Sequence, residues 1–412
     1  MIKISEIDKK VFDDYLSTHD NQHFLQTSDI GYRRSLEGWK TYLLGFFKDD
    51  NLIGAMQMSG IKVFLNYKRY EVVMGPLLDY DNKAQTKEAM KALKDYMDEI
   101  KAIECEISPN LSINVHYPKL YSIRDKEETI KIFKDSGWSL VEGIEGLDSK
   151  LRWFFKKNIK QFETYNDLTN SYERETNRLI ANAKTFPLKV IELDEDNLSR
   201  AINILDETGE RRDFSTRNQG YHESLYKYMN KNNEAKYMVV ELDVREYLNI
   251  LKKEVAQIKQ DIVADSDNDS KRARNRVNQN KDQLNAREKR IKQLKEIKAE
   301  TIDICSGVFI GANNTMTYLF GGSKKEFMRY YGTYFLQDYS IHYAYDKGYE
   351  IYDFYGTRSK ISGFPEEEGI FDFKKGFGGK LYENIGYFEY KRKSLVNTFI
   401  ESLRKIKHAI SN

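Results

Sequence analysis

Few residues in this chain have the types and spacing that covalent or metal-assisted catalysis requires. The two cysteines, Cys105 and Cys305, stand 200 positions apart, and the six histidines are scattered along the 412 residues. That spacing excludes a disulfide framework and a cysteine-based metal site, so we expect no metal. No Gly-x-Ser-x-Gly nucleophile elbow occurs either. The chemistry that remains is positioning and electrostatics, in which fixed cations stabilise a developing negative charge.

Two stretches have the composition of anion-binding sites. An acetyl-CoA site needs a turn of the form Arg/Gln-x-x-Gly-x-Gly/Ala at the start of a helix. The best match is 329–334, but it ends in the bulky Tyr334, so we predict no cofactor and no use of acetyl-CoA. The basic run 271–276, KRARNR, could contact RNA phosphates or an anionic lipid surface. A solvated outer helix face is the alternative interpretation.

The composition restricts the class of protein. Lys and Arg total 66 and Asp and Glu total 64, a formal charge of +2, which argues against a protein that holds nucleic acid by bulk positive charge. Aromatic residues make up 13% of the chain, far too many for a disordered protein. No apolar run approaches the ~20 residues that span a bilayer, and the first residues lack the core of a signal peptide. We therefore expect an intracellular protein whose membrane contact is peripheral.

A long helical hairpin is predicted in the segment that contains neither glycine nor proline, the two residues that interrupt helices. Neither glycine nor proline occurs between Tyr221 and Ser306. Apolar residues repeat there at heptad spacing on both sides of the polar stretch 265–270: Leu248, Leu251, Val255, Ile258 and Ile262, then Val277, Leu284, Ile291, Leu294 and Ile297. We expect an antiparallel pair of helices over 244–300, with arms ~35–40 Å long.

The rest of the chain has alternating strand and helix patterns that repeat weakly. Apolar runs split by turns predict strands at 41–48, 52–61, 72–78, 103–107, 302–310 and 315–320. Two helices end alike, at Gly137-Trp138 and at Gly348-Tyr349, each before a strand. We expect one α/β domain at 1–150, a second at 151–243 and 301–395 interrupted by the hairpin at 244–300, and a C-terminal helix at 396–412.

Several motifs resemble those of the FemABX aminoacyltransferases. The most specific are 352–356 (YDFYG), 369–377 (GIFDFKKGF) and 383–388 (ENIGYF). Phe-Leu-Gln at 24–26, MGPLLD at 74–79 and Arg-Trp at 152–153 are similar to the family as well. The resemblance follows the chain in order, and it includes the helical arm that marks the FemA and FemB branch.

This resemblance implies an α/β (α+β) fold of two GNAT-like acyltransferase domains with an antiparallel coiled-coil arm. It implies an enzyme that transfers an amino acid, glycine in the FemA and FemB branch, from aminoacyl-tRNA. The acceptor is an amine on the stem or bridge peptide of a lipid-linked peptidoglycan precursor, and the product is the interpeptide bridge of the cell wall. The implied place of work is the cytoplasm, at the cytosolic face of the membrane. A homodimer or a pairing with related transferases is also implied.

The resemblance gives the catalytic role to Phe373 and Lys374. Attack of an amine on the ester of aminoacyl-tRNA builds a tetrahedral oxyanion, which a nearby cation stabilises. In the family the matching Phe-Lys pair lies at the reaction centre. Lys374 is therefore the expected catalytic cation, with Phe373 stacking beside it and Lys375 as the competitor. A surface lysine on a strand edge is the alternative.

The resemblance also implies an acceptor site made of an Arg and a Tyr four positions apart. Arg217 and Tyr221 fit, and that spacing would put both on one helical face. Arg211 and its neighbour Arg212 compete for the role of Arg217. The later aromatic of the family falls at Tyr318, and strict alternation would put Phe320 on the same face of the strand. An N-terminal basic contact is expected at Arg34 or at Arg33 beside it.

The chain also departs from the family. Relatives often carry Asp-Pro where this sequence has Ser108-Pro109, so a proposed base is missing. Either that carboxylate is not essential, or Glu106 substitutes for it, or the activity is altered. The alternative functions are therefore a paralogue that uses serine or alanine as the donor amino acid, and a non-catalytic scaffold of cell-wall synthesis.

Overall fold

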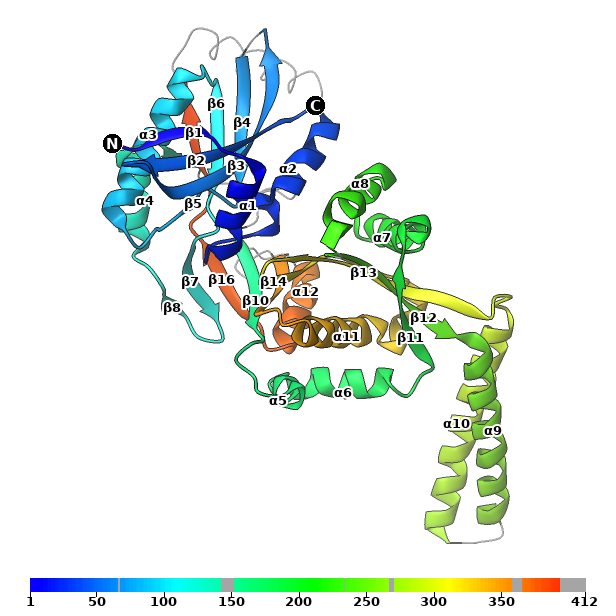
Figure 1. Ribbon diagram of the computed structural model, residues 1–412. Helices are drawn as coiled ribbons and strands as arrows, with labels where there is room; N and C mark the ends of the chain where they lie inside the picture. The colour runs from blue at the N-terminus through cyan, green and yellow to red at the C-terminus, as the bar shows by residue number, and fades with distance from the viewer. Residues whose placement is uncertain (66, 142–151, 233, 267–269, 358–364, 393–412) are drawn as a thin grey trace.

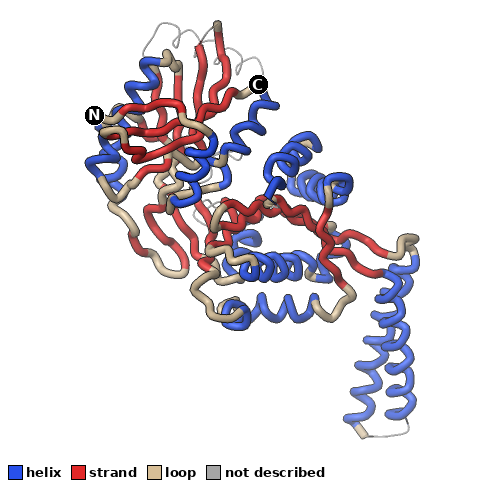
Figure 2. The backbone as a smooth tube through the Cα atoms, viewed as in Figure 1, coloured by secondary structure: helices blue, strands red, loops and turns tan. Residues whose placement is uncertain are grey.

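The computed structural model describes residues 1–65, 67–141, 152–232, 234–266, 270–357 and 365–392. It contains two β-sheets, the helices that cover them, and a pair of long helices that projects from one end (Figures 1 and 2). The predicted α/β class is confirmed. The predicted C-terminal helix at 396–412 lies outside the described residues. Among the described helices, none has both the length and the apolar character needed to cross a bilayer.

The first sheet has the strand order β1-β2-β3-β4-β6-β17-β9, with β5 paired to β3. Its strands are β1 (Lys3–Glu6), β2 (Lys40–Lys48), β3 (Asn51–Phe64), β4 (Tyr67–Val73), β5 (Leu77–Leu78), β6 (Glu104–Ser108), β9 (Ser139–Leu140) and β17 (Phe388–Lys391). The single strand predicted at 72–78 is wrong, because Met74 has φ +56° and breaks the run between β4 and β5.

The second sheet has the order β11-β12-β13-β14-β15-β10-β16-β7-β8. Its strands are β7 (Ser112–Tyr117), β8 (Tyr121–Ser122), β10 (Trp153–Asn158), β11 (Leu188–Leu193), β12 (Ala235–Asp243), β13 (Thr301–Ala312), β14 (Thr315–Ser323), β15 (Ile351–Thr357) and β16 (Lys380–Asn384). Only β14 and β15 run parallel, and they pair over just three residues each, from Thr315↔Ile351 to Thr317↔Asp353. Beyond that point the two strands separate.

Helices cover both faces of each sheet (Figure 1). The first sheet is flanked by α1 (Lys9–Thr18), α2 (Ser28–Arg34), α3 (Lys83–Glu99) and α4 (Lys126–Asp135). The second carries α7 (Ser199–Arg212) and α8 (Gln219–Met229) on one face, and α5 (Tyr165–Asn170), α6 (Arg174–Ala183), α11 (Gly332–Asp346) and α12 (Pro365–Gly376) on the other. Short 3-10 turns lie at η1 (Phe24–Gln26), η2 (Ser35–Glu37) and η5 (Lys325–Tyr330).

The two sheets exchange strands across the domain boundaries that the sequence suggested. Strands β7 and β8 precede residue 150 but belong to the second sheet, and β17 follows residue 301 but pairs with β6 and β9 in the first. A boundary drawn along the sequence misses this exchange because strand pairing depends on position in space.

The predicted repeat is present, but the elements of the two halves correspond differently from the prediction. In both sheets an antiparallel meander ends in one parallel pair, β4–β6 across α3 and β14–β15 across α11. The counterpart of the α11–β15 junction is therefore α3–β6. The α4–β9 junction at Gly137 corresponds instead to α12–β16. The predicted match of Gly137 with Gly348 is wrong, because similar helix caps occur at several junctions.

The predicted hairpin at 244–300 consists of α9 (Val244–Ser266) and α10 (Lys271–Lys295). Ser270 caps α10 by accepting a hydrogen bond from the backbone N–H of Ala273. Leu251, Ile258 and Leu294 are buried between or beneath the helices, and salt bridges such as Lys259–Glu288 (2.9 Å) join them along the sides. The hairpin leaves the second sheet between β12 and β13 and projects away from the body (Figure 2).

A buried carboxylate ties together elements of both halves. Glu383 of β16 accepts hydrogen bonds from Asn114 (2.7 Å), Lys126 (2.7 Å) and Arg152 (2.6 Å), and His116 Nε2 lies 2.8 Å away. Burial alone would raise the pKa of Glu383, but these hydrogen bonds and the charge of Arg152 together lower it to about 2. Glu383 therefore fixes β16, which directly follows α12, against β7, α4 and β10.

Candidate functional site

A cavity opens where β14 and β15 separate. Its volume is about 450 Å³. Its walls come from α7, α11, α12, the 3-10 turn η5 and the strands β14 and β15. The lining residues that carry polar or aromatic side chains are Thr208, Arg211, Arg212, Tyr318, Phe320, Ser323, Thr333, Tyr334, Phe354, Tyr355, Phe373 and Lys374. Four of the seven residues predicted for the site therefore lie around one cavity. The separation of two parallel strands creates a space that neither strand can fill.

Lys374 lies in the last turn of α12 and is 6% exposed. Its Nζ donates to the carbonyl oxygen of Gly356 at 2.6 Å and lies 3.4 Å from that of Tyr355. The alternative of a surface lysine on a strand edge is therefore wrong. The neighbouring Lys375 points elsewhere and pairs with Glu173 at 3.3 Å, so only Lys374 of the two lines the cavity.

Aromatic rings pack around Phe373, the residue before Lys374. The ring of Phe373 lies 5.1 Å from that of Tyr334 and 5.3 Å from that of Phe377, both edge to face. Tyr334 is the residue that ends the stretch 329–334 considered above for acetyl-CoA, and α11 begins within that stretch, at Gly332. A bulky ring thus stands at the position where an acetyl-CoA turn needs a small residue.

Arg211 reaches the cavity from the end of α7. Its guanidinium donates to the carbonyl oxygen of Ser323 at 2.6 Å, which fixes it at the rim. Arg212 also lines the cavity and is exposed. Arg211 and Arg217, which were predicted to compete for one role, therefore lie in different places, since Arg211 lines this cavity and Arg217 does not.

Tyr318 and Phe320 lie on opposite faces of the sheet, contrary to the prediction from alternation. Tyr318 pairs with Phe309 and Phe320 with Val308, so β14 carries an extra residue, Leu319, at a bulge. The bulge reverses the alternation. Tyr318 stacks on Phe309, with 5.2 Å between ring centroids, whereas Phe320 packs on the α7 and α8 side. A hydroxyl at 320 would therefore face away from that of Tyr318.

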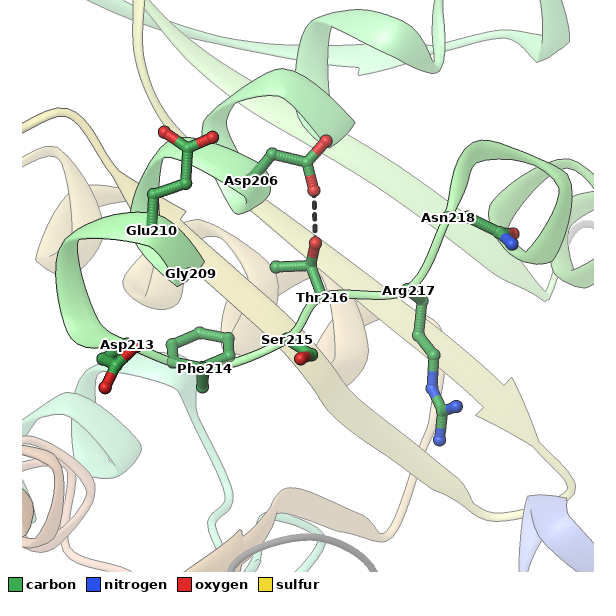
Figure 3. Close-up of a pocket in the computed structure, with 9 residues that line it drawn as sticks. All are labelled: Asp206, Gly209, Glu210, Asp213, Phe214, Ser215, Thr216, Arg217 and Asn218. Carbon is green, nitrogen blue, oxygen red and sulfur yellow. Dashed lines mark hydrogen bonds between the residues drawn. The ribbon is translucent and has the colours of Figure 1, made fainter. Parts of the chain in front are cut away.

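Arg217 and Tyr221 come together, although not on one helical face. Asn218 caps α8 by accepting from the N–H of Tyr221 at 2.9 Å, so the helix begins at Gln219 and Arg217 precedes it. The guanidinium of Arg217 still lies 5.2 Å from the centre of the Tyr221 ring. Arg217 also borders an open depression of about 520 Å³, and Figure 3 shows its side chain directed away from Asp206 and Glu210.

Of the two residues predicted for an N-terminal basic contact, Arg33 is the one that lies beside Tyr221. Its guanidinium carbon lies 4.4 Å from the centre of the Tyr221 ring, and the residue is 6% exposed. Within the described part of the chain its Nε has no hydrogen-bond partner. Arg34 lies away from both cavities, paired with Glu71 at 2.7 Å and stacked 4.1 Å above the Trp39 ring. The sequence could not separate these neighbours because α2 turns them to different sides.

Tyr355 connects the two groups of residues. Its side chain packs with Tyr221 and Phe320 in one apolar cluster, while its backbone carbonyl faces Lys374. Burial raises the pKa of Tyr355, so its hydroxyl stays protonated at neutral pH. Arg217 and Tyr221 thus lie next to the cavity that contains Lys374, and sequence reasoning assigned Tyr355 no role.

Ser108 and Glu106 take no part in either depression. The hydroxyl of Ser108 accepts a hydrogen bond from the N–H of Met74 at 3.1 Å. Glu106 lies within β6, opposite Glu71 on one side and Glu389 on the other. Neither residue lines the cavity with Lys374. The site therefore offers a fixed ammonium, aromatic walls and nearby guanidinium groups, which suit binding of anions and stabilisation of an oxyanion.

Comparisons with known proteins find relatives that cover almost the whole chain. The lipid II:glycine glycyltransferase of Staphylococcus aureus (strain bovine RF122 / ET3-1) is 28% identical, over 95% of this chain and 93% of its own length. Aminoacyltransferase FemA of Staphylococcus aureus (strain MRSA252) is 24% identical, over 99% of this chain and all of its own length.

The fold has a solved counterpart. The crystal structure of FemX superposes with a TM-score of 0.73 at 24% identity, covering 97% of this chain and all of that one. The sequence model of the FemAB family matches residues 7–405. The match extends over almost the whole length, from just after β1 to the last described residue, 392, and beyond. This chain belongs to the FemAB family.

Proposed function

We propose that this protein is an aminoacyltransferase that moves an amino acid, glycine in the first instance, from aminoacyl-tRNA to the peptide of a lipid-linked peptidoglycan precursor. The product is a segment of the interpeptide bridge. The observation that carries the proposal is the buried Lys374 ammonium at the wall of the 450 Å³ cavity. The names of the relatives, a lipid II:glycine glycyltransferase and an aminoacyltransferase, point to the same chemistry.

The reaction asks for a cation and for no covalent nucleophile. The donor ester is already activated, and attack by the acceptor amine gives a tetrahedral oxyanion. The oxyanion collapses to the amide as the bond to the tRNA ribose oxygen breaks, and that oxygen leaves as a hydroxyl with the proton that the amine gives up. Lys374, held by two backbone carbonyls, supplies the positive charge that stabilises this oxyanion. Phe373 and Tyr334 provide the ring faces against which the end of the tRNA packs. We propose no cofactor, because Tyr334 occupies the place of a CoA turn.

The acceptor binds beside the cavity. Arg33 and Arg217 flank the ring of Tyr221, and guanidinium groups hold phosphates and carboxylates through paired hydrogen bonds. The precursor is anionic, so this cluster is its docking point. From there the acceptor amine reaches the ester past Tyr355.

The arm contributes to tRNA binding. The sequence of α10 contains ten basic and two acidic residues, a formal charge of +8, whereas α9 has four of each. A protein with a net charge of only +2 needs such a local patch to hold a polyanion. Arg287 and Arg276 form ion pairs with α9, which leaves most of the positive charge of α10 facing outward.

Membrane contact is proposed at the β3–β4 end of the first sheet. Lys62 lies opposite Lys68, and Arg69 opposite Ile61, while the neighbouring Leu65 is 65% exposed. Basic residues beside an apolar tip suit an anionic lipid surface, at about 1 kcal/mol for each charge near it. This end lies far from the arm (Figure 1), so a lipid-linked acceptor and a tRNA can be bound together at the cytosolic face.

The experiment that tests the function is transfer by the purified full chain. The protein is incubated with lipid-linked precursor and, separately, with glycyl-, seryl- and alanyl-tRNA, and the mass of the peptide is followed. With glycyl-tRNA, we expect the mass of the peptide to increase by one glycine residue for each transfer. An adduct only with serine or alanine would identify a paralogue with another donor. No adduct with any of the three would favour the scaffold function.

A further inference from the structure

Strand β15 carries a bulge beside Lys374. Lys156 of β10 pairs with Asp353 and Phe154 pairs with Gly356, so two residues of β15, one of them Tyr355, face a single residue of β10. Tyr355 has φ +63°, in the left-handed region. For a residue with a side chain this conformation costs about 1–2 kcal/mol. Bulges and strained residues of this kind are frequent next to active sites.

Asp353 stabilises the bulge from within the protein. Its Oδ1 accepts a hydrogen bond from the backbone N–H of Tyr355 at 2.7 Å. The residue is 1% exposed, and among the described residues its Oδ2 has no hydrogen-bond partner. Burial raises the pKa of the Asp353 carboxyl, while the charges of Lys156 and Lys374 oppose that rise. A buried oxygen without a partner destabilises a fold by about 1–3 kcal/mol, so stability alone does not account for an aspartate here.

The bulge has a direct consequence for the cavity. It places the carbonyl oxygens of Tyr355 and Gly356 at 3.4 Å and 2.6 Å from Lys374 Nζ. In a regular strand, successive carbonyls point to opposite sides and could not both face one ammonium. The left-handed conformation of Tyr355 brings them to the same side. The hydrogen bond that the Tyr355 N–H donates to Asp353 is thus the first of a series of contacts that ends at the ammonium.

We propose that Asp353 is a positioning residue that holds the β15 bulge and thereby directs the Lys374 ammonium at the cavity. It does not contact the substrate, since it lies behind the cavity wall. The reaction that Lys374 assists is the transfer proposed above, and the inference rests on that proposal for its effect on rate. The geometric part, Asp353 to Tyr355 to Lys374, does not depend on it.

The test combines a chemical readout with kinetics. Trace acetylation with acetic anhydride, followed by peptide mass spectrometry, measures the reactivity of individual lysines in the full chain. Lys375, adjacent in sequence and paired with Glu173, is the internal control. We expect Asp353→Ala to raise acetylation of Lys374 severalfold relative to Lys375. The kcat for transfer should fall about 100-fold, with both KM values near those of the unmodified protein.

Two further variants identify the mechanism. Asp353→Asn keeps an oxygen that accepts from the Tyr355 N–H, so it should retain low Lys374 reactivity and most of kcat. Glycine adopts φ +63° without strain, so the double variant D353A/Y355G should restore low Lys374 reactivity, and it also serves if D353A alone does not fold. The proposal is overturned if D353A leaves Lys374 reactivity unchanged, or if D353N behaves like D353A. If the unmodified protein transfers nothing, the proposed function fails while the acetylation result still decides the positioning role.

Discussion

The charge on Glu383 should be essential for stability at neutral pH and lose that importance in acid. The substitution that tests this is Glu383→Gln, which keeps the size of the side chain but removes its charge. Glu383 is 4% exposed and its partners come from β7, α4 and the residue just before β10. The glutamine leaves Lys126 and Arg152 without their shared anion.

The magnitude follows from the pKa. Lowering the pKa of Glu383 from 4.5 to about 2 corresponds to about 3 kcal/mol of stability at pH 7. This agrees with the ~3–5 kcal/mol lost when one partner of a buried ion pair is removed. Because the folded-state pKa is below the unfolded one, this stability is fully present above about pH 4.5. It is lost as the pH falls from there towards 2.

The assay is urea-induced unfolding followed by tryptophan fluorescence at pH 7, 5 and 3. Trp153 lies 4.6 Å from His116, so it reports on this region. Glu389→Gln is the matched control, because Glu389 bonds Lys391 at the surface (2.9 Å) and should change stability by less than about 0.5 kcal/mol. A loss of stability below about 1 kcal/mol at pH 7, or a loss that does not shrink in acid, would show that the charge of Glu383 does not stabilise the fold.

Three further predictions concern substrates and catalysis. Lys374→Ala should lower kcat for transfer about 10²–10³-fold with an unchanged melting temperature, and Lys375→Ala should not; equal effects in a steady-state assay would contradict the assignment. Arg217→Ala should raise the KM for the lipid-linked precursor about tenfold with little change in kcat, while Arg178→Ala, at a surface pair on α6, leaves KM unchanged. Arg274→Glu on the arm should weaken the binding of aminoacyl-tRNA in a filter-binding assay and reduce the salt dependence of that binding. Weaker binding of the lipid-linked precursor instead would show that the arm binds the acceptor.

The elements that repeat locally were predictable from the sequence. The hairpin at 244–300 was readable because heptad spacing and the absence of glycine and proline act within each helix. The helix ends at Gly137 and Gly348 were readable for the same reason. Their match to each other was wrong, because the sheet order depends on pairings between distant strands such as β17 with β6.

The sequence allowed the types of the site residues to be predicted, but not their positions in space. The motif around Lys374 correctly indicated residues that line the cavity. The bulge at Leu319 puts Phe320 on the opposite face of the strand from the predicted one. Such a bulge could not be predicted because it leaves no mark in the residue types. Arg33 and Arg34 could not be told apart in the sequence, because they differ only in the side of α2 from which their side chains project. Asp353 and Tyr355 lie in the motif 352–356, but no role was assigned to them, since a left-handed residue other than glycine, asparagine or aspartate is rare and the sequence does not predict it.

The most direct test of the account is single-turnover transfer from glycyl-tRNA to the lipid-linked precursor by the unmodified chain and by Lys374→Ala. The reaction is followed as the mass increase of the precursor peptide. We expect the unmodified chain to add glycine, and we expect the variant to bind both substrates with unchanged affinity but to transfer about 10²–10³-fold more slowly. Transfer at the same rate by both proteins would contradict the central claim that the buried Lys374 ammonium stabilises the transition state.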